Sequence, residues 1–270
     1  MIDYRSSPLN GRRSVKNALS MFDTGAATHV GIVRQRNEDN YLACPDTGVW
    51  SVADGMGGHY AGDLASRVVV DALRSIETVT SAAELLARCE ASIIEANARL
   101  KEIARERGGI VMGTTVAVLL VYETDYACLW SGDSRIYRIR DAKIEQISRD
   151  HTELEELVVE GLLSREEAQN WPGRNVITRA IGVDDEPELE MINGVLRADD
   201  IFVICSDGLT AHVEDREILD QVTSVGSQQA CDNLIALTLQ RGAVDNVTVL
   251  VIHYLSNKAD ASTCQSSQTD

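Results

Sequence analysis

Residues 52–66, VADGMGGHYAGDLAS, lead an apolar segment directly into Asp54, a cluster of glycines and a single histidine, His59. An apolar run that ends at glycine predicts a buried strand, here over 49–53. Beyond the glycines, apolar residues recur every three or four positions over 64–76, which predicts an amphipathic helix. The chain therefore places a carboxylate where a buried strand meets a glycine-rich loop. Such a carboxylate is costly unless it is paired, hydrogen-bonded or bound to a metal.

Helices and strands follow this stretch in blocks. A second helix is predicted to begin at Ser81, because Ser81 and Glu84 have the spacing of a capping box, and to end at the glycines 108–109. Two more helices are predicted at about 214–224 and 228–241. The predicted strands between and after these helices are TTVAVLLVY, YACLWS, RIYRIR, KIEQIS, IFVICS and NVTVLVIHY. This order predicts a layered α+β domain rather than a doubly wound parallel sheet.

Length and composition favour one cytoplasmic domain. The 270 residues suffice for a single domain at about 25–254, and the polar, aperiodic ends at 1–24 and 255–270 are expected to be flexible. The formal charge of −17 argues against nucleic acid or an anionic membrane as a partner and favours a cation. No run approaches the ~18 apolar residues of a membrane span. The six cysteines contain no CxxC pair, which predicts reduced thiols.

Four acids stand beside predicted strands: Asp54, Asp133, Asp207 and Asp245. Each alone is also explained by ordinary turn chemistry, because aspartate and glycine favour turns. As a set without HExxH or a cysteine cluster, they offer oxygen ligands, which select Mg²⁺ or Mn²⁺ over zinc. Two such ions would suit activation of water for attack on phosphorus.

The glycines after Asp54 fit this interpretation. Gly55, Gly57 and Gly58 would allow a tight turn at positive φ, let backbone approach closely and offer carbonyl oxygens to a metal. A nucleotide-binding loop fits worse, since DGMGGH matches neither GxGxxG nor GxxxxGK[ST].

Two further features each allow two interpretations. The segment VRQRNEDN is either a charged surface turn, or it supplies Arg34 to grip a phosphate and Glu38 and Asp39 to lie in or behind a metal site. His59 is either a solvated loop histidine or, beside a bound phosphate, the acid that protonates a leaving alkoxide.

Several short motifs occur together in one order. They are Arg34 with NED at 37–39, ADGMGGH from 53, GTT at 113, GDSRIYR from 132, DH at 150, NVITRAIG from 175, CSDGL from 205 and VDNVTV from 244. As a set they resemble the bacterial branch of the metal-dependent protein phosphatases of the 2C type, the PPM family, which remove phosphate from serine and threonine. The resemblance covers about residues 25–254.

The resemblance implies a four-layer α-β-β-α sandwich of two antiparallel sheets flanked by helices. It implies that Asp54 bridges two Mn²⁺ or Mg²⁺ ions, that the Gly55 carbonyl binds one of them, and that Asp207 and Asp245 complete the shell of the other. Asp133 would serve a third, weaker metal. A hydroxide that bridges the metals would attack phosphorus directly, without a phosphoenzyme.

The remaining site residues have implied roles as well. Glu38 and Asp39 would act mainly through waters or behind the metals, Arg34 would hold the substrate phosphate, and His59 would be the general acid. The segment at about 152–175 resembles a flap over the site, although Trp171 departs from the usual pattern before Pro172.

The resemblance also implies partners. We expect a monomer that acts on phosphorylated serine/threonine proteins in the cytoplasm and opposes a Ser/Thr kinase. One alternative is a pseudophosphatase that binds phosphoprotein without turnover. The usual sign of a pseudophosphatase is the loss of a metal-binding acid, and this chain keeps all of them. Another is a phosphatase governed by an attached sensory domain, for which we expect no room in this chain.

Overall fold

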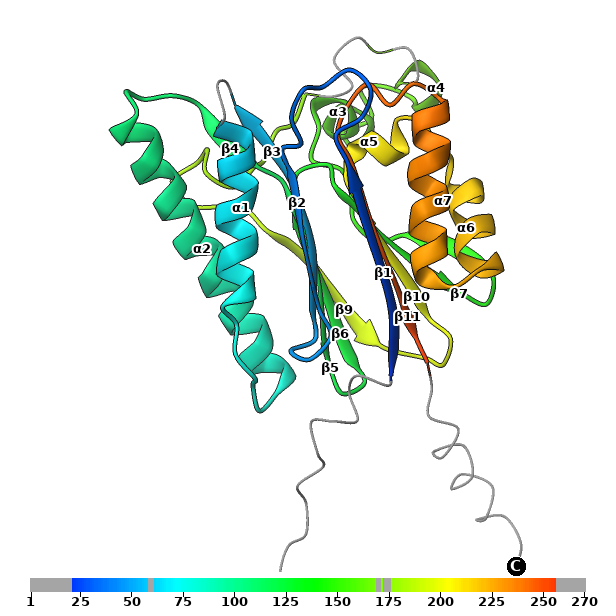
Figure 1. The fold of residues 1–270 in the computed structure, drawn as a ribbon. Coiled ribbons are helices and arrows are strands. Elements are labelled where there is room, and N and C mark those ends of the chain that lie inside the picture. The colour runs from blue at the N-terminus through cyan, green and yellow to red at the C-terminus, as the bar shows by residue number, and fades with distance from the viewer. Residues whose placement is uncertain (1–20, 58–60, 169–170, 172–175, 256–270) are drawn as a thin grey trace, which may run out of the picture.

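The computed structural model describes residues 21–57, 61–168, 171 and 176–255 (Figure 1). The first strand begins at Phe22, three residues before the boundary expected from the sequence, because Phe22 already pairs with Tyr254. The rest of the expected N-terminal segment and the tail from 256 lie outside the described residues, so their expected flexibility stays a prediction.

Two antiparallel sheets form the centre of the molecule. The first has the order β1 (Phe22–His29), β11 (Val247–Tyr254), β10 (Ile201–Cys205), β7 (Arg135–Arg140) and β8 (Lys143–Gln146). The second has the order β2 (Asp39–Cys44), β3 (Val49–Gly57), β5 (Val116–Tyr122), β6 (Asp125–Ser131) and β9 (Glu190–Val195), with β4 (Met112–Thr114) paired to β3. In the first sheet, the first and last strands of the described residues, β1 and β11, pair along their whole length.

Helices cover the outer faces of both sheets, which gives the four layers seen in Figure 1. Beside the second sheet lie α1 (Ala61–Arg74) and α2 (Ala82–Glu106), and beside the first lie α5 (Asp207–Thr210), α6 (Asp215–Ser224) and α7 (Ser227–Gln240). Two short helices, α3 (Glu153–Val159) and α4 (Arg165–Ala168), occupy the described part of the expected flap. The α+β sandwich predicted from the sequence is confirmed. No helix among the described residues is long and apolar enough to cross a bilayer.

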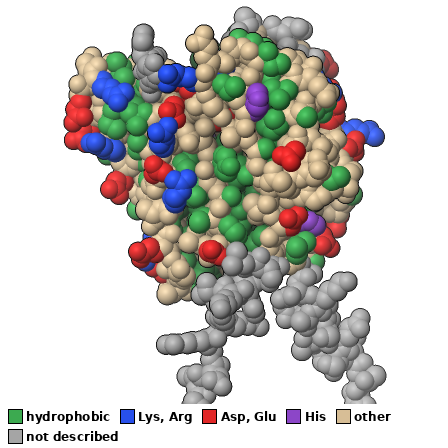
Figure 2. Space-filling view, viewed as in Figure 1, with side chains coloured by type: hydrophobic (Ala, Val, Ile, Leu, Met, Phe, Trp, Pro, Cys, Tyr) green, Lys and Arg blue, Asp and Glu red, His purple; other side chains and the backbone are tan. Residues whose placement is uncertain are grey.

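Apolar side chains fill each of the three spaces between the layers. Leu73 and Leu100 belong to the core beneath α1 and α2, Trp50 and Phe202 to the core between the sheets, and Leu234 to the core beneath α7. Figure 2 shows hydrophobic side chains down the centre of one face, between α1 and α7, where the edge strands β1 and β2 of the two sheets lie. Burial on both faces explains why the central strands read as almost continuous apolar runs.

The capping box predicted at Ser81 forms only in part, whereas α4 begins with a complete one. The side chain of Ser81 caps α2 by accepting a hydrogen bond from Glu84 N at 3.2 Å, but the Glu84 carboxylate accepts from Thr80 N at 2.8 Å instead of from Ser81. At α4 both bonds of the capping box form, between Ser164 and Glu167.

The strand that was predicted to end at Ala53 runs on to Gly57. Residues 55–57 find partners in β4, so Asp54 lies inside a paired strand and not in a turn. Gly57 has a φ of 146°, as expected for a glycine-only conformation, whereas Gly55 is needed for close packing: a Cβ there would lie 2.0 Å from the carbonyl oxygen of Gly62 in α1. Gly58 lies outside the described residues.

Gly25 lets α7 pack against β1. A Cβ on Gly25 would lie 2.3 Å from the carbonyl carbon and oxygen of Ser227, both backbone atoms that cannot turn aside. We expect Gly25→Ala to lower the free energy of unfolding by about 1–3 kcal/mol, measured by urea denaturation. Gly226→Ala is the matched control, because its Cβ would have only one neighbour, at 3.8 Å, and should change stability by less than about 1 kcal/mol. Equal effects would show that close packing at Gly25 carries no stability.

Candidate active site

Five aspartates meet at one end of the sandwich. Asp54 of β3 faces Asp39 of β2 in the antiparallel register. Asp207 is the first residue of α5, Asp133 lies in the turn between β6 and β7, and Asp245 comes two residues before β11. Their charges act on one another: after burial, the charges of the other four aspartates all raise the pKa of Asp54. The fold therefore gathers acids that are far apart in the sequence.

Asp39 links the two sheets at this end. Its Oδ2 accepts hydrogen bonds from Ser206 Oγ at 2.8 Å and from Thr248 Oγ1 at 2.7 Å, both of which belong to the other sheet or its ends. Its Oδ1 is buried and has no hydrogen-bond partner among the described residues. Burial raises the pKa of Asp39 to about 6, against the opposing effect of the two hydroxyls.

A set of hydroxyls holds the backbone of Asp54. Asp54 N donates to Thr115 Oγ1 at 3.0 Å, and the Asp54 carbonyl accepts from Thr114 Oγ1 at 2.8 Å and from Thr115 N at 2.8 Å. Thr115 Oγ1 lies 2.7 Å from Ser134 Oγ, beside Asp133. These hydroxyls belong to the motifs GTT and GDS, although the motifs alone did not predict this role for them. The available signal was a hydroxyl residue at or next to the end of an apolar strand in each motif.

The negative charges of the buried aspartates are only partly balanced by nearby positive charges. Burial and then repulsion from neighbouring carboxylates hold the pKa of Asp54 well above its usual range, raise the pKa of Asp207, and bring that of Asp133 to about 7. Asp54 and Asp207 interact closely enough for Asp54 to affect the pKa of Asp207, and the buried Oδ1 of Asp207 has no hydrogen-bond partner among the described residues. Such a group of buried oxygens fits a divalent cation, whose charge would offset the repulsion.

Arg34 places a positive charge beside the acids. Its Nη2 donates to Asp245 Oδ2 at 2.7 Å, and this bond is the largest cause of the raised pKa of the guanidinium. The arginine side chain is 53% exposed, so it can also be reached from solvent. Arg34 and Asp245 therefore lie together at the mouth of the site.

Asn246, a residue to which sequence reasoning gave no role, fastens the loop that carries Arg34 and Glu38. Its Oδ1 accepts from Glu38 N at 2.8 Å, and its Nδ2 donates to the carbonyls of Val30 at 2.8 Å and Arg36 at 2.7 Å. These three bonds fix the β1–β2 loop against the start of β11. They hold Arg34 and Glu38 near Asp245, although these residues are more than 200 positions apart in the sequence.

The Gly55 carbonyl and the Glu38 carboxylate share a small space beside Gly62. A Cβ built on Gly62 would lie 2.7 Å from the Gly55 oxygen and 2.7 Å from Glu38 Oε1. Only a residue without a side chain leaves this space open. Two oxygen ligands that face one gap suit a hard cation.

Within the described residues, no three His, Cys, Asp or Glu side chains close around one point as a finished metal cage. One of the five aspartates, Asp245, is instead paired with Arg34. The acids, the Gly55 carbonyl, Glu38 and Arg34 are thus brought to one region. His59 lies outside the described residues, so its role is not placed.

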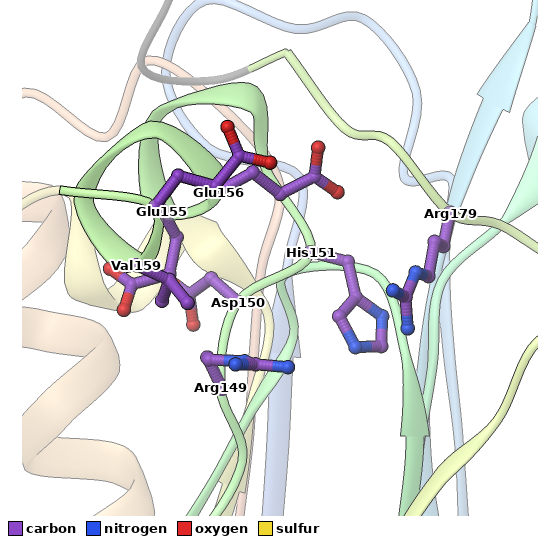
Figure 3. A pocket seen from close by; sticks show the side chains of 8 residues that line it. Arg149, Asp150, His151, Glu155, Glu156, Val159 and Arg179 are labelled. Atoms are coloured by element: carbon purple, nitrogen blue, oxygen red, sulfur yellow. The ribbon is translucent and has the colours of Figure 1, made fainter. Parts of the chain in front are cut away.

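A cavity of about 370 Å³ opens between the flap helix α3 and the segment 149–151 (Figure 3). Asp150 on its wall accepts two hydrogen bonds from Arg135 Nε and another from Arg135 Nη2, and its charge contributes to the raised pKa of Asp133. His151, also on the wall, accepts from Gly132 N at 3.1 Å through Nδ1, and burial lowers its pKa. The cavity is therefore next to the acid cluster. Residues 169–170 and 172–175 of the expected flap lie outside the described residues.

Comparison with known proteins gives consistent matches. The family model described as protein phosphatase 2C matches residues 29–234. The serine/threonine protein phosphatase PstP of Mycobacterium tuberculosis is 37% identical over 223 residues, which is 82% of this chain but 43% of that relative. The chain thus spans less than half the length of this relative.

Solved structures agree in fold. PppA of Pseudomonas aeruginosa, described as a key regulatory component of T6SS, has a TM-score of 0.81 at 38% identity, covering 87% of this chain and 98% of that one. The catalytic domain of PstP in complex with two manganese ions has a TM-score of 0.78 at 34% identity, covering 87% and 99%.

The buried aspartates should make the stability of the metal-free protein depend on pH. Because the pKa values of Asp39 and Asp133 are raised in the fold, the native state binds more protons than the unfolded state between about pH 4 and pH 7. The stability of the metal-free protein should therefore fall as the pH rises through this window.

In chelator at pH 8, Asp54→Asn should raise the free energy of unfolding by about 1–3 kcal/mol, measured in urea.

Asp232→Asn on the exposed surface of α7 is the control and should change little. Mn²⁺ should stabilise the wild-type protein and the control but stabilise Asp54→Asn far less. A lower free energy of unfolding in metal-free Asp54→Asn would mean that repulsion among the aspartates does not destabilise the fold.

Proposed function

The chain belongs to the protein phosphatase 2C family, and from this premise we propose that it is a metal-dependent phosphatase that hydrolyses phosphoserine and phosphothreonine in proteins. The observation that carries the proposal is the meeting of five aspartates from both sheets beside one accessible arginine. That combination joins ligands for hard cations to a group that binds phosphate.

We assign the ligands as follows. Asp54, Asp207, Asp245 and the carbonyl of Gly55 would hold two Mn²⁺ or Mg²⁺ ions, and Asp133 would serve a third. When bound, such ions would activate water and offset the charge of the phosphate. The structure with two manganese ions belongs to the similar PstP domain and supports this choice of metal and number.

The other residues of the chain would position these ligands. Asp39 is tied to Ser206 and Thr248, and the backbone of Asp54 is tied to Thr114 and Thr115, so the ligands rest on fixed supports. The Glu38 carboxylate faces the Gly55 oxygen and would act through water. A rigid second layer of this kind keeps ligands in place when charge changes during the reaction.

Arg34 would bind the substrate phosphate. Its guanidinium is more than half exposed and forms its ion pair with Asp245, so a phosphate dianion and Asp245 would compete for it. The attacking group we propose is water and not a protein side chain, so no phosphorylated enzyme would form. His59 would protonate the leaving alkoxide from the glycine loop.

The biological setting follows from the same proposal. We infer a monomeric cytoplasmic enzyme that opposes a Ser/Thr kinase. The five cysteines that the structure describes are free, and four of them are buried, as expected in a reducing compartment.

The first test compares charge-neutral variants of the metal ligands. Asp54→Asn and Asp207→Asn should each reduce hydrolysis of p-nitrophenyl phosphate in Mn²⁺ by at least about 100-fold, because each removes charge from the ligand set. Their circular dichroism spectra should match that of the wild-type protein. Asp232→Asn is again the control. Wild-type protein without manganese-dependent hydrolysis at any pH would instead support a pseudophosphatase.

A second test isolates the phosphate-binding group. Arg34→Ala should raise KM for p-nitrophenyl phosphate about tenfold and change kcat less, because it loses an interaction with the ground-state phosphate. Arg67→Ala removes a surface arginine paired with Asp63 on α1 and should leave both constants unchanged. An unchanged KM in Arg34→Ala would remove Arg34 from the phosphate site.

A further inference from the structure

We propose that an aliphatic surface beside the site, formed by Ile32, Val33 and Val244 and here called the aliphatic rim, binds an apolar side chain next to the phosphorylated residue of a protein substrate. The proposal rests on the proposed phosphatase function and adds a substrate class to it. The enzyme should prefer phosphorylated segments that carry a large aliphatic residue close to the phosphoserine or phosphothreonine.

The rim residues are more than half exposed to solvent. The exposed fractions are 62% for Ile32, 65% for Val33 and 55% for Val244. Other large hydrophobic side chains are also exposed, such as Val111 and Leu162, but these three stand on two loops that are hydrogen-bonded to each other beside Arg34 and Asp245. Contiguous exposed apolar surface of this kind marks binding sites more often than isolated exposed residues do.

The three residues belong to one surface although they are far apart in the sequence. Ile32 N donates to the carbonyl of Ala243 at 2.9 Å, which joins the β1–β2 loop to the α7–β11 loop. Gly31 has a φ of 81°, and a Cβ there would lie 2.2 Å from the carbonyl oxygen of Asp245. The two loops therefore lie against each other. Figure 2 shows hydrophobic side chains at the upper end of the molecule, over the region of these loops.

The rim is also held in place. The three hydrogen bonds of Asn246 fix the backbone of the β1–β2 loop at Val30, Arg36 and Glu38, on both sides of Ile32 and Val33. The exposed side chains thus stand on a supported backbone. A prepared surface of this kind binds with less loss of conformational entropy than a loose one.

The position of the rim indicates its occupant. Val33 directly precedes Arg34 and Val244 directly precedes Asp245, and these two charged side chains are bonded at 2.7 Å. An extended peptide advances about 3.3 Å per residue, so a phosphate held at Arg34 would bring its one or two neighbouring residues to the rim. Continuity with the phosphate-binding arginine therefore favours a substrate segment as occupant over a second copy of the chain.

The experiment compares pairs of phosphopeptides that differ in one flanking residue. Each pair carries leucine or serine at one of the two positions before or after phosphothreonine, and kcat/KM is measured in Mn²⁺. At one position at least, the leucine peptide should be preferred by about five- to tenfold, as expected for burial of part of an aliphatic side chain. In the Ile32→Ser/Val244→Ser double variant this ratio should fall toward one.

Ile94→Ser is the matched control, because Ile94 is 55% exposed on α2, away from the rim loops, and the ratio should persist there. A wild-type enzyme that hydrolyses p-nitrophenyl phosphate but shows no preference at any position overturns the inference and leaves the proposed function standing. A preference that survives in the double variant overturns it as well. Sedimentation that shows a dimer lost in the double variant would assign the rim to a second copy, against the proposal. Absence of hydrolysis of every substrate would overturn the proposed function itself.

Discussion

Repulsion among carboxylates at the junction of the two sheets is the constraint on which the site depends. Asp39 and Asp54 face each other on neighbouring strands, and Asp207 and Asp245 approach from the other sheet. Hydrophobic burial in three cores provides the free energy that holds these acids together, because nothing in the acids themselves favours their approach. The stability of the sandwich and the affinity of the site for cations are therefore linked.

Hydrogen bonds from neutral side chains fix the positions of these closely spaced aspartates. The hydroxyls of Ser206 and Thr248 hold one oxygen of Asp39, and Thr115 and Asn246 hold the backbone on either side of the acids. None of these groups changes the net charge. They fix where each ligand lies, which is the requirement for a site whose ligands repel one another.

The sequence predicted the layered α+β class, the helices near 64–76 and 81–107, and the set of acids beside strands, because these depend on local periodicity and on residue type. It missed the continuation of β3 through Asp54, since that depends on pairing with β4. It also missed the roles of Thr115 and Asn246, because hydroxyl and amide side chains beside strands acquire a role only through partners that lie far away in the sequence. Local sequence patterns do not predict which distant strands pair, as β1 does with β11.

The assignment of the metal ligands is tested most directly by a crystal structure of the protein grown with manganese, with anomalous scattering recorded near the manganese absorption edge. We expect at least two anomalous peaks between the carboxylates of Asp54, Asp207 and Asp245 and the carbonyl of Gly55, with Arg34 released from Asp245. A map without peaks among these residues, or with manganese bound only elsewhere, would contradict the assignment of the site.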